Sequence, residues 1–157
     1  MALFQKLYKF EAEQYLPVSL DKAWEYFSNP TNLKEITPAH LGFQITNESG
    51  STKMYPGLMI TYIVKPVLGI PMRWCTEITH VEENKYFVDE QRFGPYSCWH
   101  HEHHFEKKGD GVLMKDIIYY GVPFGFIGRI ANKLFVRKEI AGIFKYRKVV
   151  TDRLFGA

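Results

Sequence analysis

The clearest fold signal in the chain is the stretch PVSLDKAWEYFSNPTNLKEITP, residues 17–38. Its first apolar residues recur at the helical spacing i, i+3, i+4 and i+7: Leu20, Ala23, Trp24 and Phe27. This spacing predicts an amphipathic helix that Ser19 caps and Asn29-Pro30 ends. A second short helix is predicted over TNLKEI, before Pro38.

The sequence on both sides of this helical stretch is typical of strands. Residues 4–15 alternate imperfectly and contain no Gly or Pro, which predicts an opening strand. After the helices, short segments separated by Gly, Pro and Asn turns predict six more strands: 42–48, 58–65, 71–82, 86–93, 97–107 and 112–121. Because the links between them are short, the strands should form an antiparallel meander.

The end of the chain is helical. Arg129 to Phe155 contains no Pro and carries an apolar stripe, which predicts a long helix weakened by Gly142. Two short helices cannot cover a curved sheet of seven strands, so the long helix should lie across its concave face. The sequence therefore predicts an α+β fold in which sheet and helix enclose a cavity.

Length and composition favour one globular domain over residues 1–157. Aromatic residues make up 16% of the chain, and such side chains wall cavities well. The net charge of +3 is too small to indicate a nucleic-acid partner, and no RNP-like, zinc-finger or phosphate-loop motif occurs.

The first ten residues and the cysteines indicate a compartment. Lysines interrupt the apolar residues of MALFQKLYKF, so neither a secretory signal nor a membrane span is expected, and the cytoplasm is predicted. Cys75 and Cys98 have no CxxC spacing and are expected to be small buried side chains without a disulfide.

Three segments carry a resemblance to a known superfamily: residues 17–38, FVDEQRFGPYSCWHHEHHF at 87–105, and IFKYR at 143–147. With them the chain resembles the START-like, or SRPBCC, superfamily of helix-grip proteins, which includes START domains, Bet v 1 allergens and polyketide cyclases. More narrowly, it looks like small bacterial members often labelled ligand-binding or cell-division-inhibitor-like. The resemblance implies an internal cavity for an apolar, lipid-like or polyketide-like molecule. It implies no single chemistry, because a shared fold hosts many activities.

Four of the six histidines lie in GPYSCWHHEHHF, residues 94–105. Strand alternation puts Trp99, His101, His103 and Phe105 on one face, which we assign to the cavity. The other face then carries solvated polar residues. His101 and His103 could chelate a metal, with Asp89 as a possible carboxylate, but nothing in the sequence indicates a closed ligand set. We therefore predict no metal and no cofactor.

Hairpin geometry adds partners to this face. A three-residue loop, Gly94-Pro95-Tyr96, keeps the inner faces of the two flanking strands in step. It would place Asp89 opposite His101 and Gln91 opposite Trp99, with Phe93 on the same side. An Asp89–His101 pair is either a structural pair or ligand anchor, or an acid–base pair that moves a proton.

Further cavity candidates come from other segments. Alternation puts Tyr62 and Trp74 on the inner faces of their strands, where they would contact either the core or a ligand. The segment GVPFGFIG, residues 121–128, lies where the last helix begins. Its glycines lower the cost of backbone movement, so Phe124 and Phe126 could gate the cavity together with loop 66–71.

Three functions remain open on these observations. The first is a non-enzymatic binder or carrier of an apolar small molecule. The second is a cyclase or dehydratase that uses Asp89 and His101 as acid and base, and the third is an interaction protein with a vestigial cavity. The last helix carries eight basic and two acidic residues. Beside the apolar segment at 121–128, this charge could support transient contact with an anionic membrane.

Overall fold

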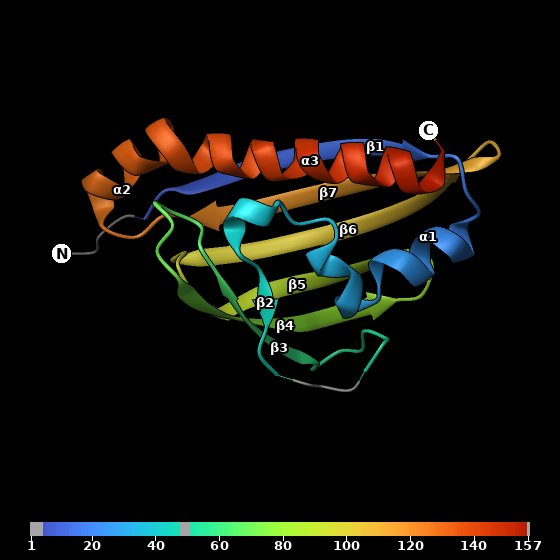
Figure 1. Cartoon of the computed structure of the whole chain (residues 1–157), viewed down its shortest axis with the longest axis horizontal. Helices are drawn as coiled ribbons and strands as arrows, with labels where there is room; N and C mark the ends of the chain where they lie inside the picture. Colours follow the sequence, from blue (N-terminus) through green and yellow to red (C-terminus); the bar gives the residue numbers. More distant parts are fainter. Residues whose placement is uncertain (1–4, 48–50, 157) are drawn as a thin grey trace.

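The computed structural model describes residues 5–47 and 51–156. Its seven strands form one antiparallel sheet in the order β1-β7-β6-β5-β4-β3-β2. The strands are β1 Leu7–Leu16, β2 Gln44–Ile45, β3 Met59–Val64, β4 Met72–Glu82, β5 Tyr86–Phe93, β6 Cys98–Lys108 and β7 Gly111–Gly121. The sheet is curved (Figure 1). The predicted curved antiparallel sheet of seven strands is confirmed.

Strand β2 is shorter than the predicted segment 42–48 because a side chain takes over part of its ladder. Asn47 Nδ2 donates to the carbonyl of Met59 at 2.8 Å, and the Thr61 amide donates to Asn47 Oδ1 at 2.7 Å. Such side-chain bonds compete with regular strand pairing. Glu48, like Phe4 in the predicted first strand, lies outside the described residues.

The first helix is confirmed as α1, Leu20–Phe27, capped by Ser19, whose Oγ accepts the Lys22 amide at 3.3 Å. The predicted second helix is a 3-10 helix, η1, over Pro30–Lys34. A second 3-10 turn, η2, follows at Ala39–Leu41.

The C-terminal helical segment begins four residues before the predicted Arg129. It comprises α2 Gly125–Ala131, a π-helical turn η3 Asn132–Val136 and α3 Arg137–Phe155. Figure 1 shows α2 and α3 lying lengthwise along the sheet beside β1 and β7. No helix among the described residues is long and apolar enough to cross a membrane.

Helices pack on two parts of the concave face of the sheet and leave a third part open to a cavity. The helices η3 and α3 pack on β1 and β7 through Val136, Ile140 and Phe144, which meet Ile118 and Tyr120. At the other end α1 closes the sheet, where the Trp24 ring lies 5.4 Å from the Phe105 ring. The concave surface of β3 to β6 is therefore left to enclose a cavity under α3.

Candidate functional site

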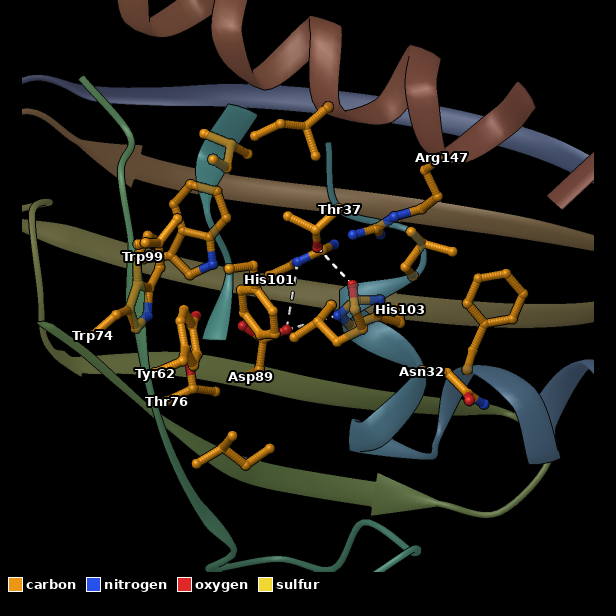
Figure 2. Close-up of a pocket in the computed structure, with 18 of the residues that line it drawn as sticks. Asn32, Thr37, Tyr62, Trp74, Thr76, Asp89, Trp99, His101, His103 and Arg147 are labelled. Carbon is orange, nitrogen blue, oxygen red and sulfur yellow. Dashed lines mark hydrogen bonds and ion pairs between the residues drawn. The ribbon is translucent and has the colours of Figure 1, made fainter. Parts of the chain in front are cut away.

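A cavity of about 150 Å³ lies between α3, the concave face of β3 to β6 and the segment from α1 to Phe43. Most of its wall is aromatic or aliphatic (Figure 2). Six of the residues predicted to bind a ligand line it: Tyr62, Trp74, Asp89, Trp99, His101 and His103. Their role in ligand binding stays a prediction.

One end of the cavity is an aromatic cluster. The Trp74 ring lies 5.6 Å from the Tyr62 ring and 5.2 Å from the Trp99 ring, which it meets edge to face. Tyr96, from the turn between β5 and β6, packs on both tryptophans. These rings provide a rigid, apolar wall.

Two predicted residues of β5, Gln91 and Phe93, lie elsewhere. The register between β4 and β5 passes from Cys75↔Phe93 to Thr76↔Gln91, so Arg92 is an extra residue in β5. Paired residues share a face, and this bulge turns Phe93 to the outer side with Cys75, where it is 53% exposed. Gln91 instead holds the turn, since its side chain bonds both backbone groups of Tyr96.

Three predicted phenylalanines also lie outside the cavity wall. Phe105 points inward as predicted, but α1 covers it, so it belongs to the packed core. Phe124 and Phe126, at the start of α2, are 80% and 72% exposed. The predicted gate at residues 121–128 therefore has no phenylalanine at the cavity.

The backbone of this segment also limits how the gate could be tested. Gly125 has φ +53°, which proline cannot adopt, so a Gly125→Pro substitution would disturb the start of the helix.

The predicted pairing of Asp89 with His101 is confirmed, but the ladder ends at Glu90↔His100, so the predicted pair Gln91–Trp99 does not form and the loop spans residues 94–97 rather than three residues. Asp89 pairs with His101 between β5 and β6, and the His101 residue is only 4% exposed. His100 points to the other side, where its ring bonds Glu90 and Glu102. Cys98, predicted to be buried, is exposed on that outer face, whereas Cys75 is buried.

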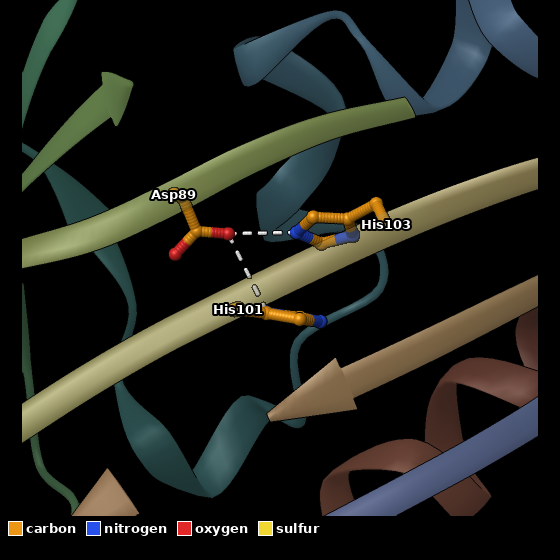
Figure 3. Close-up of side chains that lie close together, drawn as sticks. All are labelled: Asp89, His101 and His103. Carbon is orange, nitrogen blue, oxygen red and sulfur yellow. Dashed lines mark hydrogen bonds and ion pairs between the residues drawn. The ribbon is translucent and has the colours of Figure 1, made fainter. Parts of the chain in front are cut away.

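A largely buried quartet consists of Asp89, His101 and His103, which line the cavity, and Asp116, which does not. His101 and His103 stack with ring centroids 3.7 Å apart. Asp89 Oδ2, from β5, lies 2.7 Å from His103 Nε2 and 3.4 Å from His101 Nδ1 (Figure 3). On the other side Asp116 Oδ1, from β7, lies 2.8 Å from His101 Nε2 and 3.1 Å from His103 Nδ1. One oxygen of each carboxylate therefore faces both rings.

Burial and charge act in opposite directions on these four groups. Burial alone would raise the pKa of Asp89 and Asp116, but the adjacent imidazoles outweigh it and hold both pKa values below their ordinary range. Burial, helped by the neighbouring His103, lowers the pKa of His101. Burial also opposes the charge of His103, but hydrogen bonds to Asp116 and Asp89 prevail and raise its pKa.

These opposite shifts favour one arrangement of protons, in which His103 is charged and His101 is neutral. In that arrangement His101 can donate from Nε2 to Asp116 Oδ1, which lies 2.8 Å away. Its unprotonated Nδ1 then faces Asp89 across the longest of the four distances, 3.4 Å. Two carboxylates are thus balanced by His103 and by Arg147 of α3, whose Nη1 lies 3.6 Å from Asp116 Oδ1. The quartet and Arg147 together carry no net charge.

The structure brings the possible carboxylate ligand, Asp89, next to the two histidines. Ligand atoms of Asp89, His101 and His103 lie within 4.8 Å of one another, so a divalent ion could be held there. Binding would require His103 to lose its proton and would add charge beside Arg147. The quartet is already paired without an ion, and we keep the prediction that no metal is bound.

Sequence reasoning missed Asp116 and the role of Arg147. Asp116 lies between Met114 and Ile118 on the inward face of β7, and this lone charge within an apolar alternation was the available signal. Arg147 interrupts the apolar stripe of the last helix and is buried over the Phe144 ring. A charge within a buried face generally requires a partner across the core.

Comparisons with solved structures identify the fold. A ginseng major latex-like protein from Panax ginseng has a TM-score of 0.68 at 14% identity, covering 95% of this chain and 97% of that protein. A Thalictrum norcoclaurine synthase, in complex with a transition state analogue, has a TM-score of 0.65 at 15% identity, covering 94% of this chain and 95% of that protein. A Rhizobium loti protein has a TM-score of 0.67 at 10% identity, covering 93% of this chain and 98% of that protein. The sequence matches no family model and no curated protein. The chain has the helix-grip fold of Bet v 1-like proteins, as the resemblance implied.

Proposed function

We propose that the chain, acting as one domain, binds and carries an apolar small molecule in the cavity under α3. The observation that carries this proposal is a cavity whose wall is mostly aromatic and aliphatic and includes a group of charged or titratable side chains, Asp89, His101, His103 and Arg147. Known ligand sites combine an apolar wall with a few polar groups that orient the ligand.

The cavity volume limits the ligand. An apolar cavity of about 150 Å³ holds a molecule of the size of benzene, whereas sites for larger ligands measure roughly 300–1,000 Å³. A single ring fits in the observed conformation. A lipid-like or polyketide-like ligand requires α3 or the segment η1–η2 to move outward.

Native mass spectrometry of the freshly purified protein tests this function, followed by denaturing extraction of any bound compound. Ile143 lines the cavity, and Ile143→Trp should fill it and abolish retention of the compound. Val149→Trp is the matched control on the exposed side of the same helix. Equal retention by the two variants would contradict binding in this cavity.

A second candidate function is acid–base catalysis. The pKa values of His101 and His103 are pushed in opposite directions within one cavity wall, and such separation supports distinct acid and base roles. In this alternative Asp89 holds the protonated His103 in place while neutral His101 accepts a proton. The norcoclaurine synthase neighbour supports the point that this fold can carry an enzyme.

Deuterium exchange separates the two functions. The extracted compound is incubated with catalytic amounts of protein in D2O, and its mass is followed. Catalysis should give deuterium incorporation that His101→Asn removes while binding persists. A carrier gives the same mass with and without protein.

Carriage also requires a place to collect or release the ligand, and we propose an anionic membrane surface. The apolar tip consists of exposed side chains in α2 and in the loop between β3 and β4: Phe124, Phe126, Ile127, Ile130, Leu68 and Ile70. Figure 1 shows both segments at the same end of the molecule. Exposed Arg129, Lys133, Arg137 and Lys138 accompany it. Apolar residues flanked by basic ones fit the interface of an anionic bilayer. Buried Arg147 does not contribute to this surface.

Flotation with vesicles tests this contact. Binding to phosphatidylcholine vesicles containing 30% phosphatidylglycerol should exceed binding to pure phosphatidylcholine, and salt should weaken it. Phe126→Ser with Ile127→Ser should reduce it, whereas Tyr55→Ser, an exposed aromatic elsewhere, should not. If the wild-type protein forms a concentration-dependent dimer and the double variant does not, the apolar tip binds a second copy of the chain rather than a membrane.

A further inference from the structure

Three buried nitrogens on the cavity wall make no hydrogen bond within residues 5–47 and 51–156: Trp74 Nε1, Arg147 Nε and His103 Nδ1. His103 Nδ1 faces Asp116 Oδ1 at 3.1 Å as an ion pair, which leaves the indole Nε1 of Trp74 and the Nε of Arg147 as donors without an acceptor. Trp74 is 7% exposed and Arg147 is 8% exposed, and both line the cavity. A buried donor without an acceptor is costly, so such groups are nearly always satisfied by the protein, by water or by a ligand.

In Figure 2 the side chains of Trp74 and Arg147 lie on opposite sides of Asp89 and His101. Trp74 comes from β4 and stands in the aromatic cluster with Tyr62 and Trp99, while Arg147 reaches down from α3 (Figure 2). Other polar groups on the wall already have partners: Tyr62 Oη bonds Thr76 Oγ1 at 3.2 Å, and Asp89 bonds His103. Trp74 Nε1 and Arg147 Nε therefore remain as unused donors that a ligand could satisfy.

The charge balance excludes one class of acceptor. Asp89 and Asp116 are compensated by Arg147 and the protonated His103, so the polar cluster has no surplus positive charge. An anionic ligand would bring an uncompensated charge into an apolar cavity, which is strongly unfavourable. A neutral oxygen such as a carbonyl accepts a hydrogen bond without that cost.

We propose that the cavity takes a neutral, mainly apolar molecule with carbonyl-type oxygen acceptors, of the aryl ketone or quinone class, directed at Trp74 and Arg147. The inference rests on the proposed binding function and adds the ligand's chemistry. The aromatic cluster packs on the ring of such a ligand, and the two donors fix its orientation. A saturated hydrocarbon of the same shape leaves both donors without an acceptor.

Three ligands of nearly equal shape test the inference: cumene, acetophenone and benzoate. Their affinities for the wild-type protein are measured by titration and divided by their partition coefficients between water and hexadecane. In a cavity without free donors these ratios are equal. Acetophenone should exceed cumene by roughly tenfold or more on this scale, and benzoate should not bind detectably.

The donor is identified in the same titration by nitrogen-15 spectra. The chain has three tryptophans, so the Trp74 indole signal is assigned with Trp74→Phe. Acetophenone should shift the Trp74 Nε1–H or the Arg147 Nε–H signal, and cumene should give a smaller shift. Trp74→Phe or Arg147→Lys should lower the normalised affinity for acetophenone more than that for cumene, so that the ratio between the two falls.

Each outcome decides between the claims. Equal normalised affinities of cumene and acetophenone would overturn the acceptor inference and leave the binding function standing. Tightest binding of benzoate would show that the site takes anions, which also overturns the inference. If none of the three binds while Val149→Trp and wild type are folded, both the binding function and the inference fail.

Discussion

Replacing Asp116 by Asn should destabilise the protein more than any change on the outer face of the sheet. The side chain is buried and faces three cationic or potentially cationic groups: His101 at 2.8 Å, His103 at 3.1 Å and Arg147 at 3.6 Å. One pair of unit charges at about 4 Å contributes roughly 4 kcal/mol at an effective dielectric constant near 20. The desolvation of the carboxylate offsets much of this, and breaking a buried pair typically costs about 3–5 kcal/mol. For a domain of this size that corresponds to roughly 6–20 °C in melting temperature.

The free energy of unfolding that Asp116→Asn loses should depend on pH. The pKa of folded His103 is raised above the ordinary value of 6.5, so its ion pairs contribute fully below about pH 6.5. That contribution is lost as the pH rises through the raised pKa of the folded state. The pKa of Asp116 is lowered, so its contribution is present above about pH 4 and is lost as the pH falls. The difference between Asp116→Asn and wild type should therefore be larger at pH 5.5 than at pH 9.

Urea unfolding at pH 5.5 and pH 9 measures both free energies of unfolding, and urea adds no ionic screening. Glu102→Gln is the matched control on the outer face of the neighbouring strand β6. Glu102 contacts His100 at 3.2 Å and His104 at 2.7 Å, and these half-exposed pairs on the outer face should contribute less than about 1 kcal/mol. If Asp116→Asn loses the same free energy at both pH values, or no more than Glu102→Gln, the assignment of charge within the quartet is wrong.

Three further outcomes are expected. Gly142→Ala should raise the free energy of unfolding by about 0.5–1 kcal/mol, because an added Cβ on α3 meets no atom within 4 Å and alanine is the better helix former. Gly128→Ala should lower it by roughly 1–3 kcal/mol, because the new Cβ would lie 2.0 Å from a backbone carbonyl oxygen. Thermal denaturation of the two variants measures both changes. A lower melting temperature for Gly142→Ala would contradict the argument from helix propensity. Dialysis against a strong chelator should leave the free energy of unfolding and ligand binding unchanged, because no metal ion is predicted at Asp89, His101 and His103. Stoichiometric metal in elemental analysis would contradict this.

Local patterns in the sequence carried most of the fold. The cap at Ser19, the helical spacing after it and the turn residues between strands are properties of neighbouring residues, and each appears in the structure. Parity along β6 also placed His101 and His103 inside, because strand alternation is fixed by backbone geometry. Where neither periodicity nor parity is interrupted, short-range reasoning is sufficient.

The errors arose where one residue changed a pattern through a contact far along the chain. Arg92 adds a bulge against β4, so the parity that placed Phe93 inside fails at the end of β5. Asn47 replaces a strand bond across 12 residues and shortens β2. Asp116 and Arg147 meet across the cavity from a strand and a helix, and no local pattern pairs them. Contacts between such distant residues depend on how the sheet curves, and short-range sequence patterns do not determine that curvature.

The quartet itself bears on the choice between carrier and enzyme. A buried ionic cluster is a weak source of stability, because removing its charges from water cancels most of their attraction. An all-apolar wall would hold an apolar ligand at least as tightly. Two carboxylates and two imidazoles, together with Arg147, therefore require a reason other than tight binding. Fixing the orientation of one ligand is sufficient if its acceptors meet Trp74 and Arg147. Proton transfer additionally requires that a titratable atom of the ligand reach neutral His101, so a bound ligand held away from that ring identifies the protein as a carrier.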